Sequence, residues 1–252
     1  MSYEAYANWK GWDAAEFGQF NRGEDVFYNT EVKAYLPSAL SGSTVIEIGF
    51  GNGSFLGWGR KNGLTVIGIE IQPVLRERAE QSGFPVIDDL RLLEPLSVDI
   101  VAAFDVFEHI PYDSLQEMCR QAARVLKPGG YLIARFPNGD SPFALPVQNG
   151  DPTHVNAIGA GFIGELMRST GFELRELRAP AETPLHLRAR LVLPIKKLMR
   201  SAVRAYVRFA FLGATTPSTF HLNYMMIARK PSEIDARNGK SPPGARVTAL
   251  RA

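Results

Sequence analysis

The residues best suited to chemistry lie in a glycine-rich loop that follows a short apolar run. The loop is Glu47-Ile48-Gly49-Phe50-Gly51-Asn52-Gly53. Glycines allow a tight turn and a close approach of the backbone to a ligand. The spacing is G-x-G-x-G, which differs from the G-x-G-x-x-G of a dinucleotide loop. Glu47 would repel a pyrophosphate and attract a cationic ammonium group. A plain strand-to-helix turn is the alternative interpretation.

Further acids follow the next two apolar runs. Glu70 lies about 20 residues after the loop, the distance at which a carboxylate binds both hydroxyls of an adenosine ribose. A solvated strand end is the alternative for this residue. One of Asp88 and Asp89, after the third run, would contact an adenine amino group. A ligand with adenine, ribose and a cationic amino-acid tail, but without phosphate, is S-adenosylmethionine.

The elements that position these residues are predicted by short apolar runs that alternate with helical patterns. Alternation of this kind predicts an α/β doubly wound sheet, and near-continuous apolar runs favour parallel strands covered on both faces. The predicted strands are 44–49, 64–71, 84–89, 98–107, 131–138, 172–178 and 219–229. The predicted helices between them are 54–62, 73–82, 113–126 and 161–170.

Composition limits the class of protein. The chain has 252 residues, of which 45% are hydrophobic, and its mean hydropathy is −0.09. These values exclude a disordered or disulfide-stapled chain, and no apolar run is long enough to span a membrane. With one cysteine, no secretory signal and no zinc-type spacing, we expect a cytoplasmic protein without a metal site. We expect an aromatic helical lid at 1–40, a catalytic domain at 41–230 with a helical insertion at about 181–216, and a disordered tail at 231–252.

Four segments in order resemble the motifs of the class I S-adenosylmethionine-dependent methyltransferases: Val45–Gly53, Val66–Ile71, Val98–Pro111 and Arg124–Asn138. The resemblance runs from about Val45 to Phe172. It implies a mostly parallel seven-stranded sheet with the last strand antiparallel. It also implies S-adenosylmethionine as the cofactor. The residues implied at its methionine end are Glu47, Gly49, Gly51, Gly53 and Asp105. Glu70 would bind the ribose, Ile71 would pack on the adenine, and either Asp89 or Asp88 would contact the adenine amino group.

A loop after the fifth predicted strand offers a general base. Asp151 and His154 in D-P-T-H are close enough for the carboxylate to orient the imidazole. A histidine that caps a turn is the alternative. The string from Phe136 through this loop, with the helix at 159–172, loosely resembles bacterial methyltransferases that modify sugars of polysaccharides and lipopolysaccharide. That resemblance implies that His154 lies by the acceptor. For Glu108 and His109, the class I resemblance implies a turn of the chain beside the cofactor, and direct contact with the acceptor is the alternative.

Residues 22–29 and 185–212 carry side chains that predict contacts with an acceptor and with a partner surface. Tyr28, with Arg22 and Asn29, would set polar groups beside aromatic faces, as carbohydrate sites do. Residues 185–212 carry seven basic side chains and no acid, whereas residues 1–184 carry 15 basic and 24 acidic ones. This contrast argues against a broad nucleic-acid surface. A basic amphipathic helix at 191–212, with Pro194 in its first turn, predicts contact with a membrane surface; packing on its own domain or a dimer contact is the alternative.

The sequence therefore predicts an O-methyltransferase that acts on a sugar hydroxyl of a bacterial glycan or glycolipid, in the cytoplasm or at the inner membrane face. A quinone- or phenol-type O-methyltransferase shares the same motifs and is the first alternative. A cofactor-binding protein without catalysis is the second.

Overall fold

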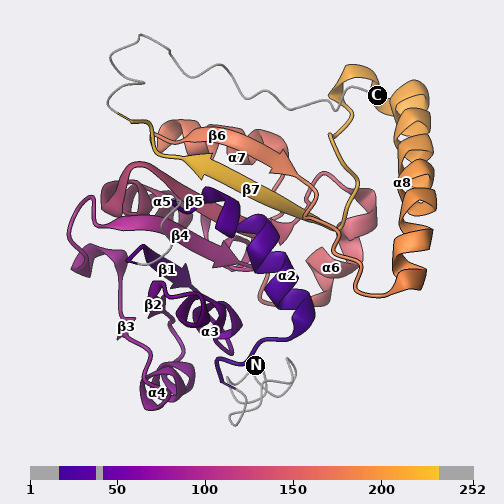
Figure 1. The fold of residues 1–252 in the computed structure, drawn as a ribbon. Helices are drawn as coiled ribbons and strands as arrows, with labels where there is room; N and C mark the ends of the chain where they lie inside the picture. The colour runs from indigo at the N-terminus through magenta and orange to yellow at the C-terminus, as the bar shows by residue number, and fades with distance from the viewer. Residues whose placement is uncertain (1–16, 38–41, 233–252) are drawn as a thin grey trace.

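The computed structural model describes residues 17–37 and 42–232 (Figure 1). Part of the expected lid, including Tyr3, Tyr6, Trp9 and Trp12, lies outside the described residues, as does the expected tail from residue 233.

The described chain is built around a seven-stranded sheet in the order β3-β2-β1-β4-β5-β7-β6. Strand β7 is antiparallel to both of its neighbours, whereas β1 to β5 pair in parallel. The expected doubly wound sheet with an antiparallel last strand is confirmed. The strands are β1 (Thr44–Ile48), β2 (Thr65–Ile69), β3 (Val86–Ile87), β4 (Val98–Phe104), β5 (Leu126–Pro137), β6 (Glu173–Arg178) and β7 (Asn223–Arg229).

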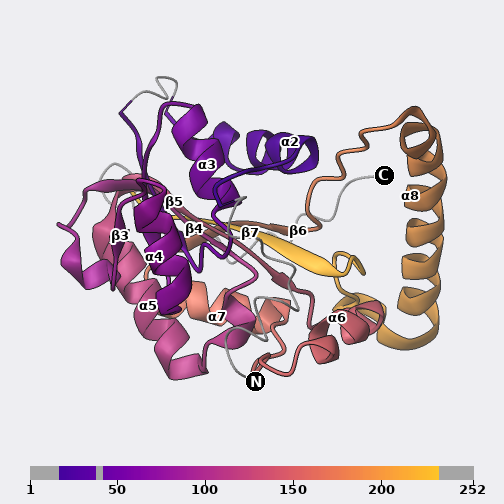
Figure 2. The same ribbon diagram turned by 90° about the horizontal axis from the view of Figure 1, so that it is seen from below.

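Helices cover both faces of the sheet, as Figure 2 shows. One buried cluster packs α2, α3 and α4 on the sheet, and a second packs α5 and α7 on the other face. In β1, Val45 belongs to the first cluster and Ile46 to the second, since successive side chains of a strand point to opposite faces. The helices are α2 (Arg22–Glu31), α3 (Ser54–Lys61), α4 (Pro73–Gln81), α5 (Tyr112–Val125), α6 (Leu145–Gly150), α7 (Ala160–Ser169) and α8 (Leu187–Val207).

Helix α2 is the described part of the N-terminal lid. It begins with a capping box in which Asn21 and Glu24 each accept a hydrogen bond from the other's backbone N–H. The buried carboxylate of Glu31, at its end, pairs with Arg178 at 2.7 Å. This pair fixes α2 to β6, and therefore to the sheet.

Several elements differ in their bounds from the sequence prediction. Strand β3 has two residues rather than six, at the edge of the sheet. Strand β5 follows α5 directly and begins at Leu126, five residues before its predicted start, so that Pro128, Gly129 and Gly130 lie within it. The pairing of β5 with β4 shifts register after Leu126, so these residues form an irregularity of the kind that glycine and proline permit in a strand.

Helix α8 begins earlier than predicted. Pro194 lies inside the helix rather than in its first turn. The proline removes one backbone N–H, which is tolerable here because water reaches the carbonyl of the exposed Arg190. A π-helical turn, Arg208–Leu212, extends α8. None of the helices in the described ranges is long and apolar enough to cross a membrane.

Candidate active site

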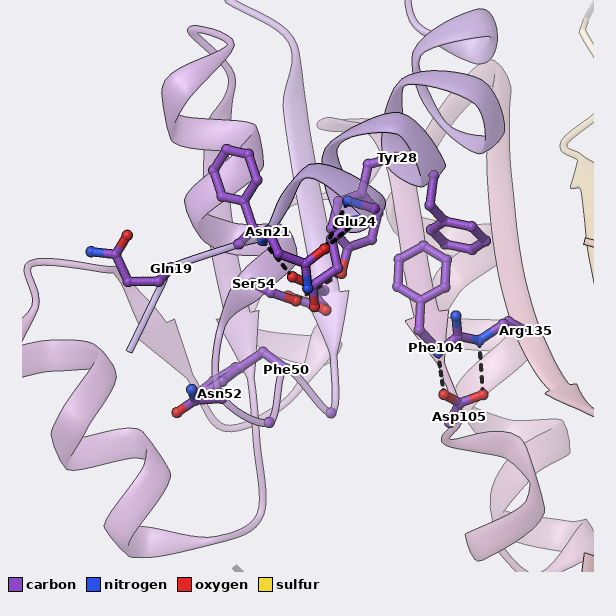
Figure 3. Close-up of a pocket in the computed structure, with 16 residues that line it drawn as sticks. Gln19, Asn21, Glu24, Tyr28, Phe50, Asn52, Ser54, Phe104, Asp105 and Arg135 are labelled. Atoms are coloured by element: carbon purple, nitrogen blue, oxygen red, sulfur yellow. Dashed lines mark hydrogen bonds and ion pairs between the residues drawn. The ribbon is translucent and has the colours of Figure 1, made fainter. Parts of the chain in front are cut away.

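A pocket of about 1140 Å³ opens at the carboxyl ends of β1 and β4 (Figure 3). This is where ligands bind in open α/β sheets. Its walls come from three places: the N-terminal segment with α2, the loop after β1, and the ends of β4 and β5. Lining residues from these elements include Glu24, Phe27, Tyr28, Glu47, Gly49, Gly51, Phe104, Asp105 and Arg135.

The glycine loop has a backbone that requires glycine. Gly49, Gly51 and Gly53 have φ angles of 67°, 53° and 74°, in the left-handed region that other residues rarely adopt. A Cβ on Gly49 would lie 2.6 Å from a methyl carbon of Val106. The predicted glycine positions are therefore needed for the turn, and Gly49 and Gly51 line the pocket.

Glu47 is a buried acid at the pocket wall, with 5% of its surface exposed. Burial raises the pKa of this carboxyl well above its ordinary value, and the nearby charge of Glu70 raises it further. Its Oε2 atom has no hydrogen-bond partner among the described residues. A buried carboxylate oxygen without a donor is suited to a cationic ligand group, and the ammonium of S-adenosylmethionine fits this requirement.

Glu70 joins the end of β2 to the glycine loop. Its carboxylate accepts from the backbone N–H groups of Ile71 at 2.8 Å, Gln72 at 3.1 Å and Gly51 at 3.4 Å. Burial raises the pKa of Glu70, and these backbone donors oppose the increase. The side chain of Ile71 is 84% exposed, which leaves an apolar surface beside the acid. Neither residue is among the described residues that line the pocket, so their contacts with ribose and adenine stay predictions.

The two acids after β3 are held by arginines. Asp89 accepts from the backbone N–H of Arg91 at 2.7 Å and forms an ion pair with its guanidinium at 2.8 Å. Asp88 pairs with Arg76. Within the described part of the chain, neither acid lines the pocket. The predicted contact of Asp89 with adenine therefore stays a prediction.

Asp105 lies at the pocket, as predicted, in a left-handed conformation with φ of 57°. Figure 3 shows its carboxylate paired with Arg135, beside Phe104. The Arg135 guanidinium also lies 5.1 Å from the ring centre of Phe27 and 5.9 Å from that of Phe104. Sequence reasoning missed this arginine, although a single Arg in the apolar run of β5 was an available signal.

His154 lies against the residue predicted to orient it, but without a hydrogen bond to it. Its Nε2 atom is 3.9 Å from Asp151 Oδ2, beyond hydrogen-bond distance. Instead, its Nδ1 donates to the backbone carbonyl of Gln148 at 2.9 Å. Asp151 accepts from the backbone N–H and hydroxyl of Thr153 at 3.0 and 2.5 Å. The Asp151 carboxylate thus bonds the adjacent turn through Oδ1, while its Oδ2 faces His154. The role of Asp151 in orienting the imidazole stays a prediction.

The polar groups predicted beside aromatic faces separate in space. Tyr28 lines the pocket, and its hydroxyl bonds the Ser54 hydroxyl at 2.8 Å. Asn29 donates to the backbone carbonyl of Asp25 at 2.7 Å. Arg22 lies at a different depression, near Arg190. Of the three, Tyr28 alone is among the described residues that line the pocket.

The sheet order, the antiparallel last strand, the glycine loop and the acids after β1 and β2 define a class I S-adenosylmethionine-dependent methyltransferase fold. A family model described as "Methyltransferase domain" matches residues 20–177, and the chain belongs to this family. The chain is thus a methyltransferase with S-adenosylmethionine as its cofactor. The interpretation as a non-catalytic binding protein has no support from this match.

Curated relatives are similar at low identity. An enzyme of Xanthomonas euvesicatoria pv. vesicatoria named ubiquinone biosynthesis O-methyltransferase is 28% identical over 160 residues, which cover 59% of this chain and 62% of that protein. This chain therefore spans less than two thirds of the length of that relative. The enzyme of the same name from Xanthomonas campestris pv. campestris (strain B100) is 27% identical over 204 residues, covering 77% of this chain and 78% of the relative.

Solved structures share the fold. A SAM-dependent methyltransferase from Archaeoglobus fulgidus superposes with a TM-score of 0.58 at 20% identity, covering 82% of this chain and 94% of that one. An S-adenosylmethionine-dependent methyltransferase from Mesorhizobium loti superposes with a TM-score of 0.54 at 16% identity, covering 80% of this chain and 97% of that one.

Proposed function

We propose that this methyltransferase transfers the methyl group to the oxygen of an aromatic hydroxyl, on a phenol of the kind found in quinone precursors. The observation that carries the proposal is the aromatic wall of the pocket, formed by Phe27, Tyr28 and Phe104 beside Arg135. The names of the curated relatives, ubiquinone biosynthesis O-methyltransferases, support the same acceptor class.

The pocket divides into two functional parts. Glu47 and the glycine loop form the part suited to the methionine end of the cofactor. Phe27 and Phe104 form the other, where an aromatic acceptor would find edge-to-face or offset-stacked partners. Holding the acceptor oxygen about 3 Å from the methyl, in line with the bond that breaks, supplies most of the catalysis.

Arg135 suits a phenol acceptor for an electrostatic reason. When bound, S-adenosylmethionine supplies a methyl group on a positively charged sulfur. The phenol oxygen forms a bond to that carbon, the carbon–sulfur bond breaks, and the phenol proton leaves to solvent. A fixed guanidinium near the oxygen stabilises the negative charge that develops as the proton leaves. Asp105 holds Arg135 in place by an Nε–Oδ1 bond of 3.0 Å.

A sugar acceptor with His154 as general base is the second candidate. The D-P-T-H loop favours it, and donation by Nδ1 to Gln148 leaves the lone pair on Nε2, as a base requires. Against it, the His154 side chain is 6% exposed and is not among the described residues that line the pocket. A base must come within hydrogen-bond reach of the acceptor hydroxyl, so this geometry favours the phenol.

Methylation assays with labelled S-adenosylmethionine separate the two candidates. We expect label in prenylated phenols and catechols, and not in nucleotide sugars or lipopolysaccharide fragments. Arg135→Gln should lower kcat by at least tenfold, because the charge beside the developing phenolate is lost. Arg175→Gln, which removes an exposed arginine of β6, is the matched control. Label in glycans alone would contradict the phenol proposal and support the sugar.

We also propose that α8 binds an anionic membrane surface, which would place the enzyme at the inner membrane face. None of the 21 residues of α8, all of them described, is buried, and the helix stands apart from the sheet in Figure 1 and Figure 2. Its exposed apolar side chains include Leu191, Ile195 and Leu198. Seven basic and no acidic residues at 185–212 complement anionic lipid, and a prenylated acceptor would reside in the same membrane.

A further inference from the structure

Outside the pocket lining, three side chains that can each ligate a metal ion converge. Glu108, His109 and His154 each offer a ligand atom, and these atoms lie within 4.8 Å of one another. Glu108 and His109 belong to the 3₁₀ turn Phe107–His109 after β4, and His154 lies in the loop that follows α6. We propose that this cluster binds a divalent transition-metal ion of the zinc type.

The first histidine presents a lone pair to the cluster. His154 Nδ1 lies 2.9 Å from the backbone carbonyl of Gln148, which can only accept a hydrogen bond, so Nδ1 carries the proton. The lone pair is then on Nε2, which lies 3.9 Å from Glu108 Oε1. A second hydrogen bond of this kind commonly fixes the tautomer and ring orientation of metal-binding histidines.

The second histidine is held in the same tautomer through Thr153. The Thr153 hydroxyl donates its one proton to Asp151 Oδ1 at 2.5 Å. It can therefore only accept from His109 Nδ1, 2.9 Å away. The proton of His109 is then on Nδ1 and its lone pair on Nε2. The two imidazoles thus have the protonation state that a metal ion requires of neutral histidine.

The two loops that carry the cluster are fixed to each other by their backbones. The N–H groups of Val155 and Asn156 donate to the carbonyl of Glu108 at 2.8 and 3.2 Å, and the Asn156 side chain donates to the carbonyl of Ile110. The backbone of the two loops is therefore already in place before any ion binds. Preorganisation of this kind lowers the entropic cost of binding.

The donor set indicates the kind of ion. Two imidazoles and one carboxylate suit zinc and other late divalent metals, whereas magnesium and calcium prefer all-oxygen sites. Zinc bonds of about 2.1 Å in a tetrahedral site put neighbouring ligand atoms about 3.4 Å apart. The 3.9 Å between His154 Nε2 and Glu108 Oε1 must therefore shorten by about half an ångström.

The bound ion would pin the turn after β4 to the loop at 151–156. A histidine that holds a metal through Nε2 cannot also take a proton there, so this site and a His154 general base exclude each other. The proposal does not depend on the acceptor being a phenol, because it is tested by binding and stability alone.

Metal binding to chelator-treated protein tests the site. We expect the wild type to bind about one equivalent of Zn²⁺ or Co²⁺, with an increase in melting temperature and, for Co²⁺, the visible absorption of a low-coordinate complex. His154→Ala and Glu108→Gln should each weaken affinity at least 100-fold. His186→Ala removes an exposed histidine at the start of α8 and should leave it unchanged.

A variant that retains all three ligand side chains tests whether the loss of binding in the ligand variants comes from misfolding. Thr153→Val removes the hydroxyl that fixes the His109 tautomer, and loss of such an outer contact typically costs about 10- to 100-fold in metal affinity. The proposal is overturned if the wild type binds no metal, if Thr153→Val and the ligand variants bind as the wild type does, or if His186→Ala weakens binding equally.

Discussion

The carboxyl edge of β1 and β2 and the helix α8 meet opposite physical demands. At the sheet edge, acids and backbone turns are buried around a pocket, and Glu47 Oε2 lacks a donor within the described structure. On α8, large apolar side chains such as Leu198 and Phe209 are exposed next to basic ones. Each arrangement is unfavourable in the isolated chain. At the sheet edge a buried polar atom lacks a hydrogen-bond partner, and on α8 apolar surface is exposed to water.

The difference indicates which kind of ligand each region takes. A small cationic group satisfies the buried acid, and the fixed backbone around it sets the specificity. On α8 the proposed ligand is an extended anionic surface, which the basic residues at 185–212, without an acid among them, would complement. If this contrast holds, substitutions at the sheet edge should affect the cofactor and substitutions on α8 should not.

The largest effect is expected for Gly49→Ala. The left-handed φ costs about 1 kcal/mol or more with any side chain, and the contact of the new Cβ with Val106 adds about 1–3 kcal/mol. Cofactor binding should be lost as the loop shifts. Gly63→Ala is the matched control, because φ is 77° there but nothing lies within 4 Å of the new Cβ. Urea unfolding and calorimetry with S-adenosylhomocysteine measure both effects; equal losses in the two variants would contradict the crowding argument.

Removal of either buried acid comes next. Glu47→Gln and Glu70→Ala should each weaken binding of S-adenosylhomocysteine by about 1.5–3 kcal/mol, roughly ten- to a hundredfold, because charge-assisted hydrogen bonds to the ligand are lost. Glu94→Gln, at an exposed position, is the control. Unchanged calorimetric affinity in either variant would remove that acid from the cofactor site.

On α8, the double substitution Lys196→Gln/Lys197→Gln should weaken binding to phosphatidylglycerol vesicles by about 2 kcal/mol, or about thirtyfold, at about 1 kcal/mol per basic residue. Cofactor affinity should not change. Arg120→Gln/Arg168→Gln removes the same charge from the exposed surfaces of α5 and α7 and serves as the control in sedimentation assays. Equal loss in both double variants would indicate a general charge effect and not a site on α8.

The smallest effect concerns pH. Because the pKa of Glu47 is raised in the folded chain, its protonated form is favoured, and its contribution to stability is lost as the pH rises through that pKa. Glu47→Gln should therefore match the wild type at low pH and become relatively more stable as the pH rises, measured by urea midpoints without ligand. A stability difference that stays flat with pH would mean that Glu47 is ionised with a compensating partner.

The fold was predictable because its signals are local. Apolar runs and glycine placement predicted all seven strands, but not all of their ends: β5 begins five residues before its predicted start and β7 begins four residues after. Strand β3 was predicted too long because Phe84 is buried without belonging to the strand. The helix of the insertion was predicted, but its start was wrong since Pro194 is tolerated inside an exposed helix.

The candidate site was predictable in part. Glu47, Gly49, Gly51 and Asp105 line the pocket, as expected from their order around the predicted strands. The partner of Asp105 is Arg135, which is thirty residues away in sequence but on the neighbouring strand, and that pairing depends on sheet order. His154 and Asp151 lie side by side at 3.9 Å, but the hydrogen bonds of Asp151 to the Thr153 turn depend on the local fold of the loop and could not be read from the D-P-T-H spacing.

The sequence by itself determined the order of strands and helices and the glycine loop, because burial patterns and the left-handed conformation are properties of short segments. Only the tertiary structure decided that Phe27, Phe104 and Arg135 share one wall, and that Glu108, His109 and His154 converge. These groups come from separate elements, and the packing of α2 and the loops against the sheet sets their distances. Spacing along the chain carries no information about such contacts until the elements have packed.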